Sequence, residues 1–440
     1  MVVKMMHKIK IISKMTYVLI PRIIRQQFLD DPVYIYKDIL KNFVNKYKLK
    51  NNNQDNGVLT LQLAENIEEL DCTYEILYKD INRDNYIDGP KIRIDNEDYY
   101  KSKLHNDLPD IKIYKIENVS VIGLSDAVIA GSKFSHHELN LMKSHHDLKR
   151  PEVFNKINES QYTIAVNYKK ISKKNNIYIS LLKEHSTNYF HWTTEGLPRL
   201  VLITDTLKKS KDFNINNYTL LIDENMPKQC KDMISLIVGL DIDIIDVKMG
   251  ESFFCEQVIY CTPFWNALDN TQGLPTPSKE FFVDKYGLNL VKDTILKNYK
   301  PKKFKQFNSK KVYLQRLNNK LRPITNIHQV ELLLHKADFE FVDVGSLSFE
   351  EQIELFQHVD IVIGVSGAAF TNLLFMKDGA KAVNFYPSVS STNYYIFQPL
   401  ADVSNVDLTH FLTIPNEGDN SIHGKSSIEL ENLELYLKEL

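Results

Sequence analysis

Short apolar runs alternate with helical patterns along the chain from about residue 177. The run 177–182 is almost entirely apolar, which is typical of a buried strand, and 191–209 has helical spacing. Strands separated by helices usually pair in parallel, and the helices then cover both faces of the sheet. The pattern therefore predicts a Rossmann-like unit. Its expected strands are 177–182, 218–222, 242–247 and 253–260, and its expected helices are 191–209 and 228–238.

The alternation stops at the basic, proline-containing segment 300–305 and then starts again, so we place a domain boundary there. Ser348 with Glu351 three residues later has the sequence of a capping box, which predicts the start of a helix. The restarted pattern predicts a second Rossmann-like unit. Its expected strands are 311–315, 339–344, 360–365 and 382–386, and helices are expected at 326–336, from Ser348 onward and at 368–376.

Strand-like runs without helical patterns fill residues 58–150 and predict a small β-rich module. The expected strands are 112–116, 119–122 and 127–129, with Gly123 and Gly131 at hairpin or bulge positions. The segment 51–57 is polar throughout and is expected to be a surface loop.

The first thirty residues hold six lysines and arginines but only one acid, Asp30, with apolar residues between the charges. This pattern fits a basic amphipathic helix on an anionic membrane surface, and it fits equally an arm that packs on its own fold. The uncharged stretch 15–21 is too short for a signal-peptide core. No apolar run approaches the roughly 18 residues that a membrane-spanning helix needs.

The composition is that of a globular protein, with 43% hydrophobic and 25% charged residues among 440. Such a length allows two or three domains. A formal net charge of −2 gives no reason to expect nucleic acid as a partner. The four cysteines form no CxxC pair, which argues against a disulfide scaffold or a cysteine-based zinc site and favours a reducing compartment.

The first candidate site lies in the segment 188–199, directly after an expected strand. His191 and Glu195 are four residues apart and share one face of a helix, so one of them could act as a general base. Either residue could be the base. No second histidine follows at the spacing of an HExxH zinc site. The alternative is a buried structural histidine beside a solvated glutamate.

The second candidate site is the pair Arg316 and Arg322, with Lys320 between them, at the end of an expected strand. Guanidinium groups bind phosphate oxygens in a bidentate manner, so the pair suits a diphosphate. The alternative is a solvated basic loop.

The third candidate site is the small-residue turn Ser366-Gly367-Ala368 between an expected strand and the helix that contains Asn372. Backbone N–H groups at a helix start attract phosphate. The alternative is tight helix–sheet packing. Neither a GxGxxG fingerprint nor a Walker A sequence is present.

Two other features invite a metal interpretation, which we do not adopt. Asp241 and Asp243 spell DxD but open a strand-like run, so we expect solvated acids. His136-His137 and His145-His146 lie in a polar stretch without a partner cysteine or paired acid, so we expect solvent-exposed histidines and no metal site.

Taken in order, the three candidate segments resemble glycosyltransferase family 61, the DUF563 proteins, over roughly residues 110–400. The matching pieces are Asn188-Tyr189-Phe190-His191-Trp192 with Leu197-Pro198-Arg199, then Arg316 and Arg322 followed by Ile324 and Asn326, and then the signature from Leu347 to Gly379. Two positions depart from the family pattern. Ser366 stands where the family commonly has histidine before the Gly-Ala pair, and His328 stands where an acid often follows the asparagine.

The resemblance implies an α/β, GT-B-like fold in which two Rossmann-like domains face a central cleft, with the β-rich module at the N-terminal side. It implies an inverting, metal-independent transfer from a nucleotide sugar, with no cofactor besides that donor, which we expect to be a UDP-sugar. The donor would contact Arg316, Arg322, Ser366, Gly367, Ala368 and Asn372, and His191 or Glu195 would be the base.

The expected domains follow from the pattern and the resemblance together. They are a basic arm and loop in 1–57, an acceptor-side domain in 58–300, a nucleotide-sugar domain in 301–390 and a tail that packs back on the fold in 391–440.

We expect a hexosyl- or pentosyltransferase for surface polysaccharide, capsule or lipopolysaccharide, acting on a glycan or lipid-linked acceptor. Its place would be the cytoplasm, as a peripheral protein of the inner membrane face held by residues 1–30. The alternative is a non-catalytic protein that binds nucleotide sugars or polysaccharide on the same scaffold.

Overall fold

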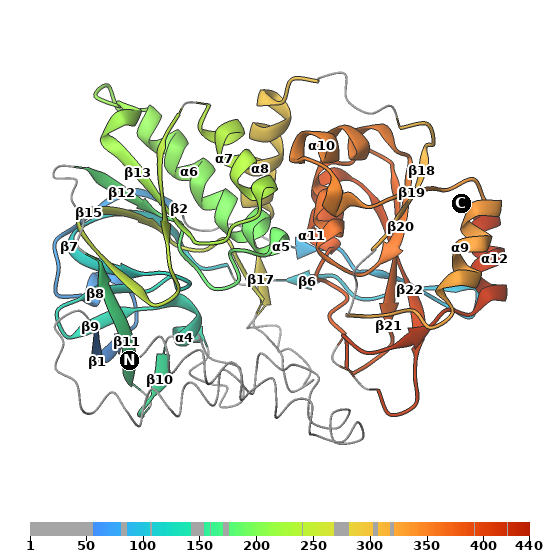
Figure 1. Cartoon of the computed structure of the whole chain (residues 1–440), viewed down its shortest axis with the longest axis horizontal. Coiled ribbons are helices and arrows are strands. Elements are labelled where there is room, and N and C mark those ends of the chain that lie inside the picture. Colours follow the sequence, from blue (N-terminus) through green and yellow to red (C-terminus); the bar gives the residue numbers. More distant parts are fainter. Residues whose placement is uncertain are drawn as a thin grey trace, which may run out of the picture. The chain divides into compact units, whose positions relative to one another are not determined.

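The structure, a computed structural model, is shown in Figure 1. It describes residues 56–80, 86–105, 108–141, 154–158, 160–169, 176–239, 241–267, 281–301, 307–316, 321–390, 392–419 and 421–440. The chain divides into two units, residues 1–54 and 55–440. The basic segment 1–30 and most of the polar loop 51–57 lie outside the described residues, while Asn56 and Gly57 begin strand β1 (Asn56–Ala64). The second unit is a mixed α/β structure with several sheets.

The first large sheet contains the Rossmann-like unit predicted from 177 onward. Strands β12, β13 and β14 pair in parallel, and β15 pairs in parallel with the other edge of β12. The predicted strands and helices of this unit are all present, with ends that differ by a few residues. Their bounds are β12 (Ile177–Ser180), α6 (Leu197–Lys208), β13 (Tyr218–Asp223), α7 (Lys228–Val238), β14 (Asp243–Val247) and β15 (Glu251–Cys261). A further helix, α8 (Lys285–Asn298), was not predicted.

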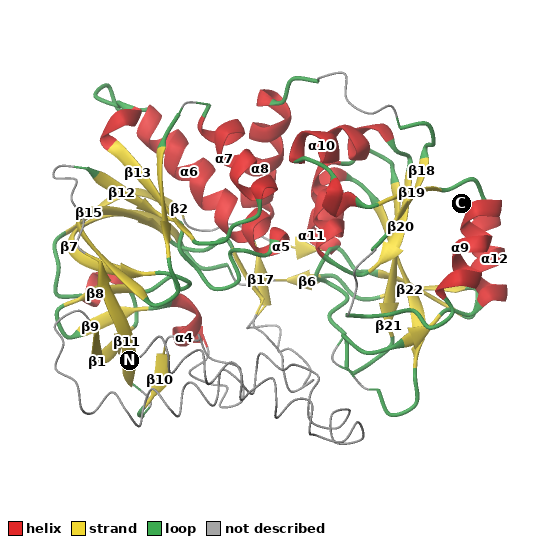
Figure 2. Cartoon of the chain, viewed as in Figure 1, coloured by secondary structure: helices red, strands yellow, loops and turns green. Residues whose placement is uncertain are grey.

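Alternate side chains of these strands enter two different cores. Ile179 and Leu220 pack with the helices α6, α7 and α8, whereas Tyr178 and Leu221 pack with the β-rich segment that covers the other face. Figure 2 shows the three helices together on one side of the strands. The sheet is therefore covered on both faces, as the apolar runs predict, but one cover is made of strands.

The β-rich segment joins the same sheet through β7 (Ile111–Ile122), which pairs antiparallel with β15. We expected two short strands here; the structure has one long strand, because β2 (Tyr74–Asp80) and β15 pair with it on both sides. Gly131, at a φ of +56°, turns the hairpin between β8 (Val128–Ala130) and β9 (Lys133–Ser135). The remaining strands on this side are β10 (Phe154–Lys156) and β11 (Gln161–Lys169), and a short helix, α4 (His137–Leu141), follows β9.

The second large sheet contains the predicted second unit. Its order is β19-β18-β20-β21-β22-β4-β5, and the pairs along this order are parallel except for β4 with β5. The short strand β23 (Ser426–Ser427) pairs antiparallel with β22. Alternation again divides the side chains, with Val362 packing toward α10 and α11 and with Ile361 and Ile363 packing toward α9 and α12. The bounds are β4 (Lys91–Ile94), β5 (Glu97–Tyr100), β18 (Lys311–Leu314), α9 (Ile327–Lys336), β19 (Glu340–Val342), α10 (Phe349–His358), β20 (Ile361–Val365), β21 (Lys381–Pro387), α11 (Gln398–Ser404), β22 (Asp407–Pro415) and α12 (Leu430–Glu439).

Two segments of this sheet come from unexpected parts of the chain. Strand β22, from the predicted tail, lies between β21 and β4 within the sheet. Strands β4 and β5 come from the span assigned to the acceptor side. The second sheet therefore draws on residues from both sides of position 300, and the division into domains stays a prediction.

The segment 368–376, expected to be a helix, is the 3₁₀-helix η7 (Ala368–Phe375). A 3₁₀-helix is wound more tightly than an α-helix, with three residues per turn. All six residues from Phe370 to Phe375 are buried, so this helix lies within the core.

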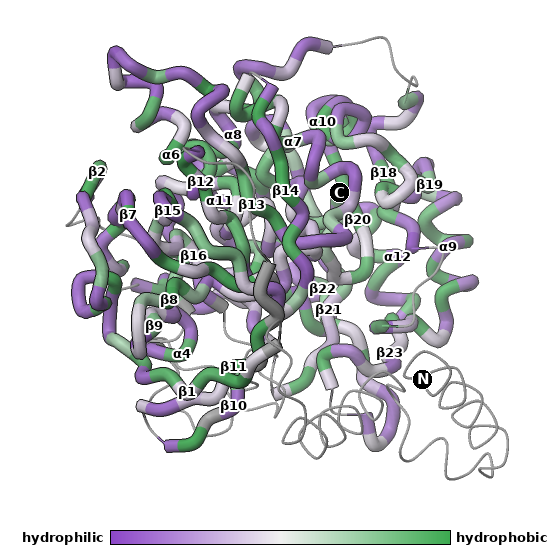
Figure 3. Tube along the Cα trace, turned by 60° about the vertical axis from the view of Figure 1, so that its left-hand side comes forward, coloured by the Kyte–Doolittle hydropathy of each residue, from purple (hydrophilic) through white to green (hydrophobic). Residues whose placement is uncertain are grey.

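One hydrophobic core connects the two large sheets. It contains Ile203 of α6 and Ile295 of α8 together with Leu355 of α10 and Leu400 of α11. Figure 3 shows apolar positions along the central strands and helices and polar positions in the outer loops. Among the described residues, no helix is long and apolar enough to cross a membrane.

Candidate functional site

The segment 188–199 is helical throughout, with an unusual first turn. Asn188 caps α5 (Tyr189–His191) by accepting a hydrogen bond from the backbone N–H of Phe190 at 2.9 Å. A π-helical turn, η4 (Trp192–Gly196), follows and leads into α6. A Cβ on Gly196 would lie only 2.6 Å from the Trp192 ring, so the wide turn closes tightly on this side chain. Turns of this type occur frequently at functional sites.

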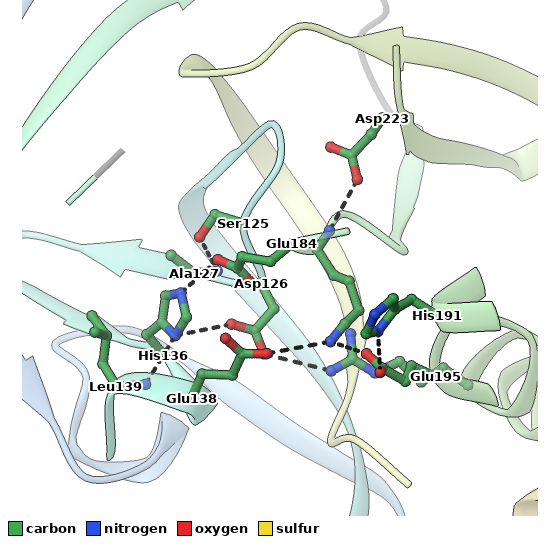
Figure 4. Close-up of polar contacts among 12 residues, drawn as sticks. Ser125, Asp126, Ala127, His136, Glu138, Leu139, Glu184, His191, Glu195 and Asp223 are labelled. Atoms are coloured by element: carbon green, nitrogen blue, oxygen red, sulfur yellow. Dashed lines mark hydrogen bonds and ion pairs between the residues drawn. The ribbon is translucent and has the colours of Figure 1, made fainter. Parts of the chain in front are cut away.

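His191 and Glu195 form the pair expected from their spacing. Nδ1 of His191 lies 2.7 Å from Oε1 of Glu195, so an ionised Glu195 keeps the ring proton on Nδ1. The His191 side chain is 19% exposed and Glu195 only 2%. Nε2 of His191 has no hydrogen-bond partner among the described residues. The imidazole therefore carries its lone pair on Nε2, and the Glu195 carboxylate lies at the other ring nitrogen, Nδ1 (Figure 4).

Glu195 is held as an anion by its surroundings. Burial acts to raise the pKa of Glu195, but the charge of Lys183 and the interaction with His191 outweigh it, and the pKa falls to about 2. Lys183 contacts Oε2 of Glu195, so both carboxylate oxygens have partners. A carboxylate so stabilised is a poor proton acceptor at neutral pH.

Lys183 belongs to a buried network of charged side chains, most of which Figure 4 shows. The lysine follows β12 and lies 3.7 Å from Oε1 of Glu138 on α4. Its backbone N–H donates to Asp223 at the end of β13, at 3.0 Å. Burial raises the pKa of Asp223 to about 7, although three hydrogen bonds favour its ionised form.

His136 forms the second centre of this network. Its two ring nitrogens lie 3.2 Å from Asp126 and 2.9 Å from Glu184, and Arg199 lies 3.6 Å from Asp126. Burial acts to lower the pKa of His136, but the two carboxylates outweigh it and raise the pKa to about 9. The expectation of solvent exposure is wrong for His136. This residue directly follows strand β9 and is fully buried in the core. His145 and His146 lie outside the described residues.

The side chains of Asp126, His136 and Glu184 could in principle ligate a metal ion, since their ligand atoms lie within 4.8 Å of one another. In this arrangement the imidazole itself lies between the two carboxylates, and Arg199 and Lys183 bring further positive charge to the same region. The charge of both acids is thus balanced by side chains of the chain itself.

Arg316 and Arg322 converge on one atom. Nη1 of Arg316 donates to the carbonyl oxygen of Ser366 at 3.0 Å, and Nη1 of Arg322 donates to the same oxygen at 2.8 Å. Burial lowers the pKa of both guanidinium groups, and the charge of Arg322 lowers that of Arg316 further. Among the described residues, neither arginine forms an ion pair with a carboxylate. The alternative of a solvated loop does not describe these two half-buried side chains.

The turn 366–368 is shaped around the arginine pair. A Cβ on Gly367 would lie 3.1 Å from NH1 of Arg316, so a larger residue would press against the guanidinium. Ser366 is buried and its N–H donates to the carbonyl of Phe385. The small residues of this turn therefore allow the arginine side chains to approach the backbone closely. Lys320 lies outside the described residues.

Asn372 connects the first and third candidate segments. The hydroxyl of Tyr189 donates to Oδ1 of Asn372 at 2.6 Å, and Nδ2 of Asn372 donates to Gln352 at 3.0 Å. Since Tyr189 precedes His191 by two residues and Asn372 follows Gly367 by five, this bond brings the two segments together.

Sequence reasoning missed Lys183, Glu138, Asp126, Asp223 and the role of His136. The position of Lys183 directly after an expected parallel strand was the available signal, because the carboxyl ends of such strands commonly carry functional side chains. Glu138 and Asp126 come from the β-rich segment, and nothing in their local pattern indicates a contact with residue 183.

The comparison with known proteins agrees with the resemblance inferred from the sequence. Residues 189–383 match the family model Glycosyltransferase 61, a span that includes His191, Glu195, Arg316, Arg322 and Asn372. No curated protein matches the chain. The matched span is shorter than the 110–400 inferred from the motifs and leaves out the β-rich segment. Over residues 189–383 the chain thus resembles the glycosyltransferase 61 family, and this match supports a glycosyltransferase.

Proposed function

We propose that this chain is an inverting glycosyltransferase that moves a sugar from a nucleotide-sugar donor to a glycan acceptor without a metal ion. The observation that carries the proposal is the pair of half-buried guanidinium groups of Arg316 and Arg322, which meet at one carbonyl oxygen without a carboxylate partner among the described residues. Burying two like charges side by side is unfavourable. A diphosphate would offset this cost, and its oxygens fit the guanidinium forks.

In this mechanism His191 is the base and Glu195 orients it. Nε2 of His191 takes the proton of the acceptor hydroxyl as that oxygen forms a bond to the anomeric carbon. The bond from the anomeric carbon to the diphosphate breaks on the opposite side, and its electron pair leaves with the phosphate oxygen. Attack from the face opposite to the leaving group inverts the configuration. The two arginines stabilise the charge that develops on the diphosphate.

The finer assignments rest on the family resemblance and on the sequence. The two large sheets would act as the two halves of a GT-B-like enzyme, with the donor near Arg316 and the turn 366–368. A UDP-sugar is the donor we propose, with transfer of a hexose or pentose. The acceptor would be a surface polysaccharide precursor, of a capsule or a lipopolysaccharide. The basic segment 1–30 would keep the protein at the cytoplasmic membrane face.

A donor screen tests the proposal. Purified protein is incubated with UDP-, GDP-, CMP- and dTDP-sugars, and the melting temperature is recorded, because a ligand that binds the folded state raises it. One nucleotide class is expected to raise the melting temperature of the wild type. Arg316→Ala and Arg322→Ala should abolish this rise and sugar transfer while the far-UV circular dichroism stays unchanged. Lys381→Ala, a lysine on β21, serves as the charge-matched control.

The outcomes separate the proposal from its alternative. Full transfer activity in both arginine variants would overturn the assignment of the diphosphate site. Donor binding that depends on the arginines, without donor hydrolysis or transfer above background, would instead favour a non-catalytic protein that binds nucleotide sugars.

A further inference from the structure

Lys183 is the one lysine of the described residues that contacts the His191–Glu195 pair, and it lies on the side of Glu195 away from His191. Its side chain is 6% exposed and contacts Glu195 on the oxygen that His191 does not use. The ring of His191 bonds only to the other oxygen, Oε1. Glu195 and the imidazole ring of His191 therefore lie between Lys183 and a substrate bound at Nε2 of His191.

Lys183 is fixed from several elements at once. Asp223 accepts the backbone N–H of Lys183 at 3.0 Å and the hydroxyl of Ser186 at 2.5 Å, which anchors the loop after β12. Glu138 on α4 is the second carboxylate near the ammonium group, at 3.7 Å. The other charged or titratable groups that act on this cluster are Asp126, His136, His137, Glu184, His191, Arg199 and Tyr260.

The charge of Lys183 determines which form Glu195 takes. With the ammonium group in contact, burial of the Glu195 carboxylate is compensated and the group stays ionised. Without it, the buried Glu195 carboxylate would lose its largest compensating charge, and a buried carboxyl group without that charge binds a proton more readily.

The protonation of Glu195 in turn determines the tautomer of His191. An ionised Glu195 accepts the Nδ1–H of the ring and leaves the lone pair on Nε2. A protonated Glu195 would donate its O–H to Nδ1, the ring proton would then reside on Nε2, and no lone pair would face the acceptor hydroxyl.

We infer that Lys183 is a positioning residue, which keeps Glu195 ionised and thereby keeps His191 in the tautomer that can accept a proton at Nε2. The inference rests on the proposed role of His191 as the base. It assigns the selection of the tautomer to a residue outside the matched family region 189–383.

The test compares Lys183→Met, which removes the charge, with Lys183→Arg, which keeps it. The ¹⁵N spectrum of histidine-labelled protein reports the tautomer of His191 and needs no substrate. At neutral pH the wild type and Lys183→Arg are expected to show the Nδ1–H form, and Lys183→Met the Nε2–H form. In a transfer assay, Lys183→Met should lower kcat by at least about 100-fold with an unchanged donor KM, since a general base contributes about that much.

Glu138→Gln is the comparison for the tautomer, because it removes the other carboxylate beside Lys183 and leaves the contact with Glu195 in place. This variant is expected to keep the Nδ1–H form. If Lys183→Met alone does not fold, the double variant Lys183→Met with Glu138→Gln removes one cation and one anion together. It should still show the Nε2–H form.

The Nδ1–H form in Lys183→Met or in the double variant would overturn the inference, whatever the activity. If Lys183→Met changes the tautomer but the wild type transfers no sugar, the role of Lys183 is upheld and the proposed function is overturned instead. Loss of kcat in Lys183→Arg, with the wild-type tautomer, would show that the lysine acts in another way and would also overturn the inference.

Discussion

At the scale of single residues, the chemistry of the His191–Glu195 pair follows from burial. The two side chains are equally suited to be a base when only their spacing is known. In the structure Glu195 has both oxygens in contact with partners and a pKa of about 2, whereas His191 is partly exposed and its Nε2 has no hydrogen-bond partner in the described part of the chain. The assignment of roles thus depends on Lys183, whose distance from the pair in space is not visible in the sequence.

Glu195→Gln is expected to lower kcat by roughly 100-fold and to leave the donor KM nearly unchanged. The amide keeps the shape of the side chain, but it carries no charge to hold the Nδ1 proton of His191. Steady-state transfer kinetics at a saturating acceptor concentration measure the effect. Glu434→Gln, an exposed glutamate that pairs with Lys438 at i,i+4 on α12, is the control and should behave as wild type. A kcat within a few-fold of wild type in Glu195→Gln would contradict the orienting role.

The sequence indicated residues whose signal is local and missed those that act across the fold. His191, Glu195, Arg316 and Arg322 were proposed as site residues because each pair lies within one short segment. Lys183 and Glu138 are separated by more than forty residues along the chain, and the strand pairings β12–β15, β15–β7 and β7–β8 bring their segments together. Their contribution is therefore a property of the fold.

At the scale of elements, the buried ion group Asp126–His136–Glu184 joins the hairpin β8–β9 to the loop after β12. The imidazolium of His136 is stabilised by two carboxylates that would otherwise be buried without a partner. Removal of one partner from such a group is strongly destabilising, because it leaves an uncompensated charge in the core.

The stability of the protein is expected to depend on His136 between pH 6.5 and 9. The folded protein keeps its proton up to about pH 9, whereas the unfolded chain releases it near 6.5. The stabilisation is therefore complete below pH 6.5 and is lost as the pH rises through 9, a change of roughly 3 kcal/mol in the free energy of unfolding. Urea unfolding at several pH values measures this change.

His136→Gln provides the comparison for that experiment. It should be less stable than the wild type at pH 6.5, and the difference between the two proteins should shrink toward pH 9. Asp223 is present in both proteins, and its titration cancels in the difference. Burial raises the pKa of Glu138 and the charge of His136 acts to lower it, so Glu138 contributes to the difference. A difference that does not change between pH 6.5 and 9 would show that His136 is not a buried cation.

The secondary structure was predictable where local rules decide it. The capping box of Ser348 and Glu351 is present with both of its hydrogen bonds, and α10 begins where it predicts. The 3₁₀ form of the helix η7 and the length of strand β7 were not predictable, because η7 is buried along six consecutive residues and β7 is paired on both of its edges. Apolar spacing alone does not carry that information.

At the scale of the whole molecule, the apolar runs predicted two α/β units, and both large sheets contain one. The order of strands in the second sheet could not be predicted from the sequence. Strand β22 comes from the expected C-terminal tail, and β4 comes from the expected β-rich module. Pairings between distant segments depend on shape and partner strands. The same holds for the core that α6 and α8 share with α10 and α11.

The hydrogen bond between Tyr189 and Asn372 is expected to couple the base to the donor side of the molecule. Tyr189 lies two residues before His191, and Asn372 lies on η7 directly after the turn that meets the arginines. Tyr189→Phe leaves Oδ1 of the buried Asn372 without its donor, which should lower the free energy of unfolding by about 1–3 kcal/mol. It should also lower kcat about tenfold through misplacement of the reacting groups, while donor binding is unchanged.

A double-mutant cycle with Tyr189→Phe and Asn372→Ala measures the coupling directly. Each single variant is expected to lose stability, and the double variant should lose about 1 kcal/mol less than the sum, because the second substitution removes a bond already broken. Tyr218→Phe, at a half-buried tyrosine on β13, is the control for loss of a hydroxyl group. Strict additivity of Tyr189→Phe and Asn372→Ala would mean that the bond contributes nothing to holding the two segments together. The placement of His191 relative to Arg316 would then depend on the shared hydrophobic core and on the other polar contacts between the two parts, such as those of Gln229 with the carbonyls of Gly345 and Leu347.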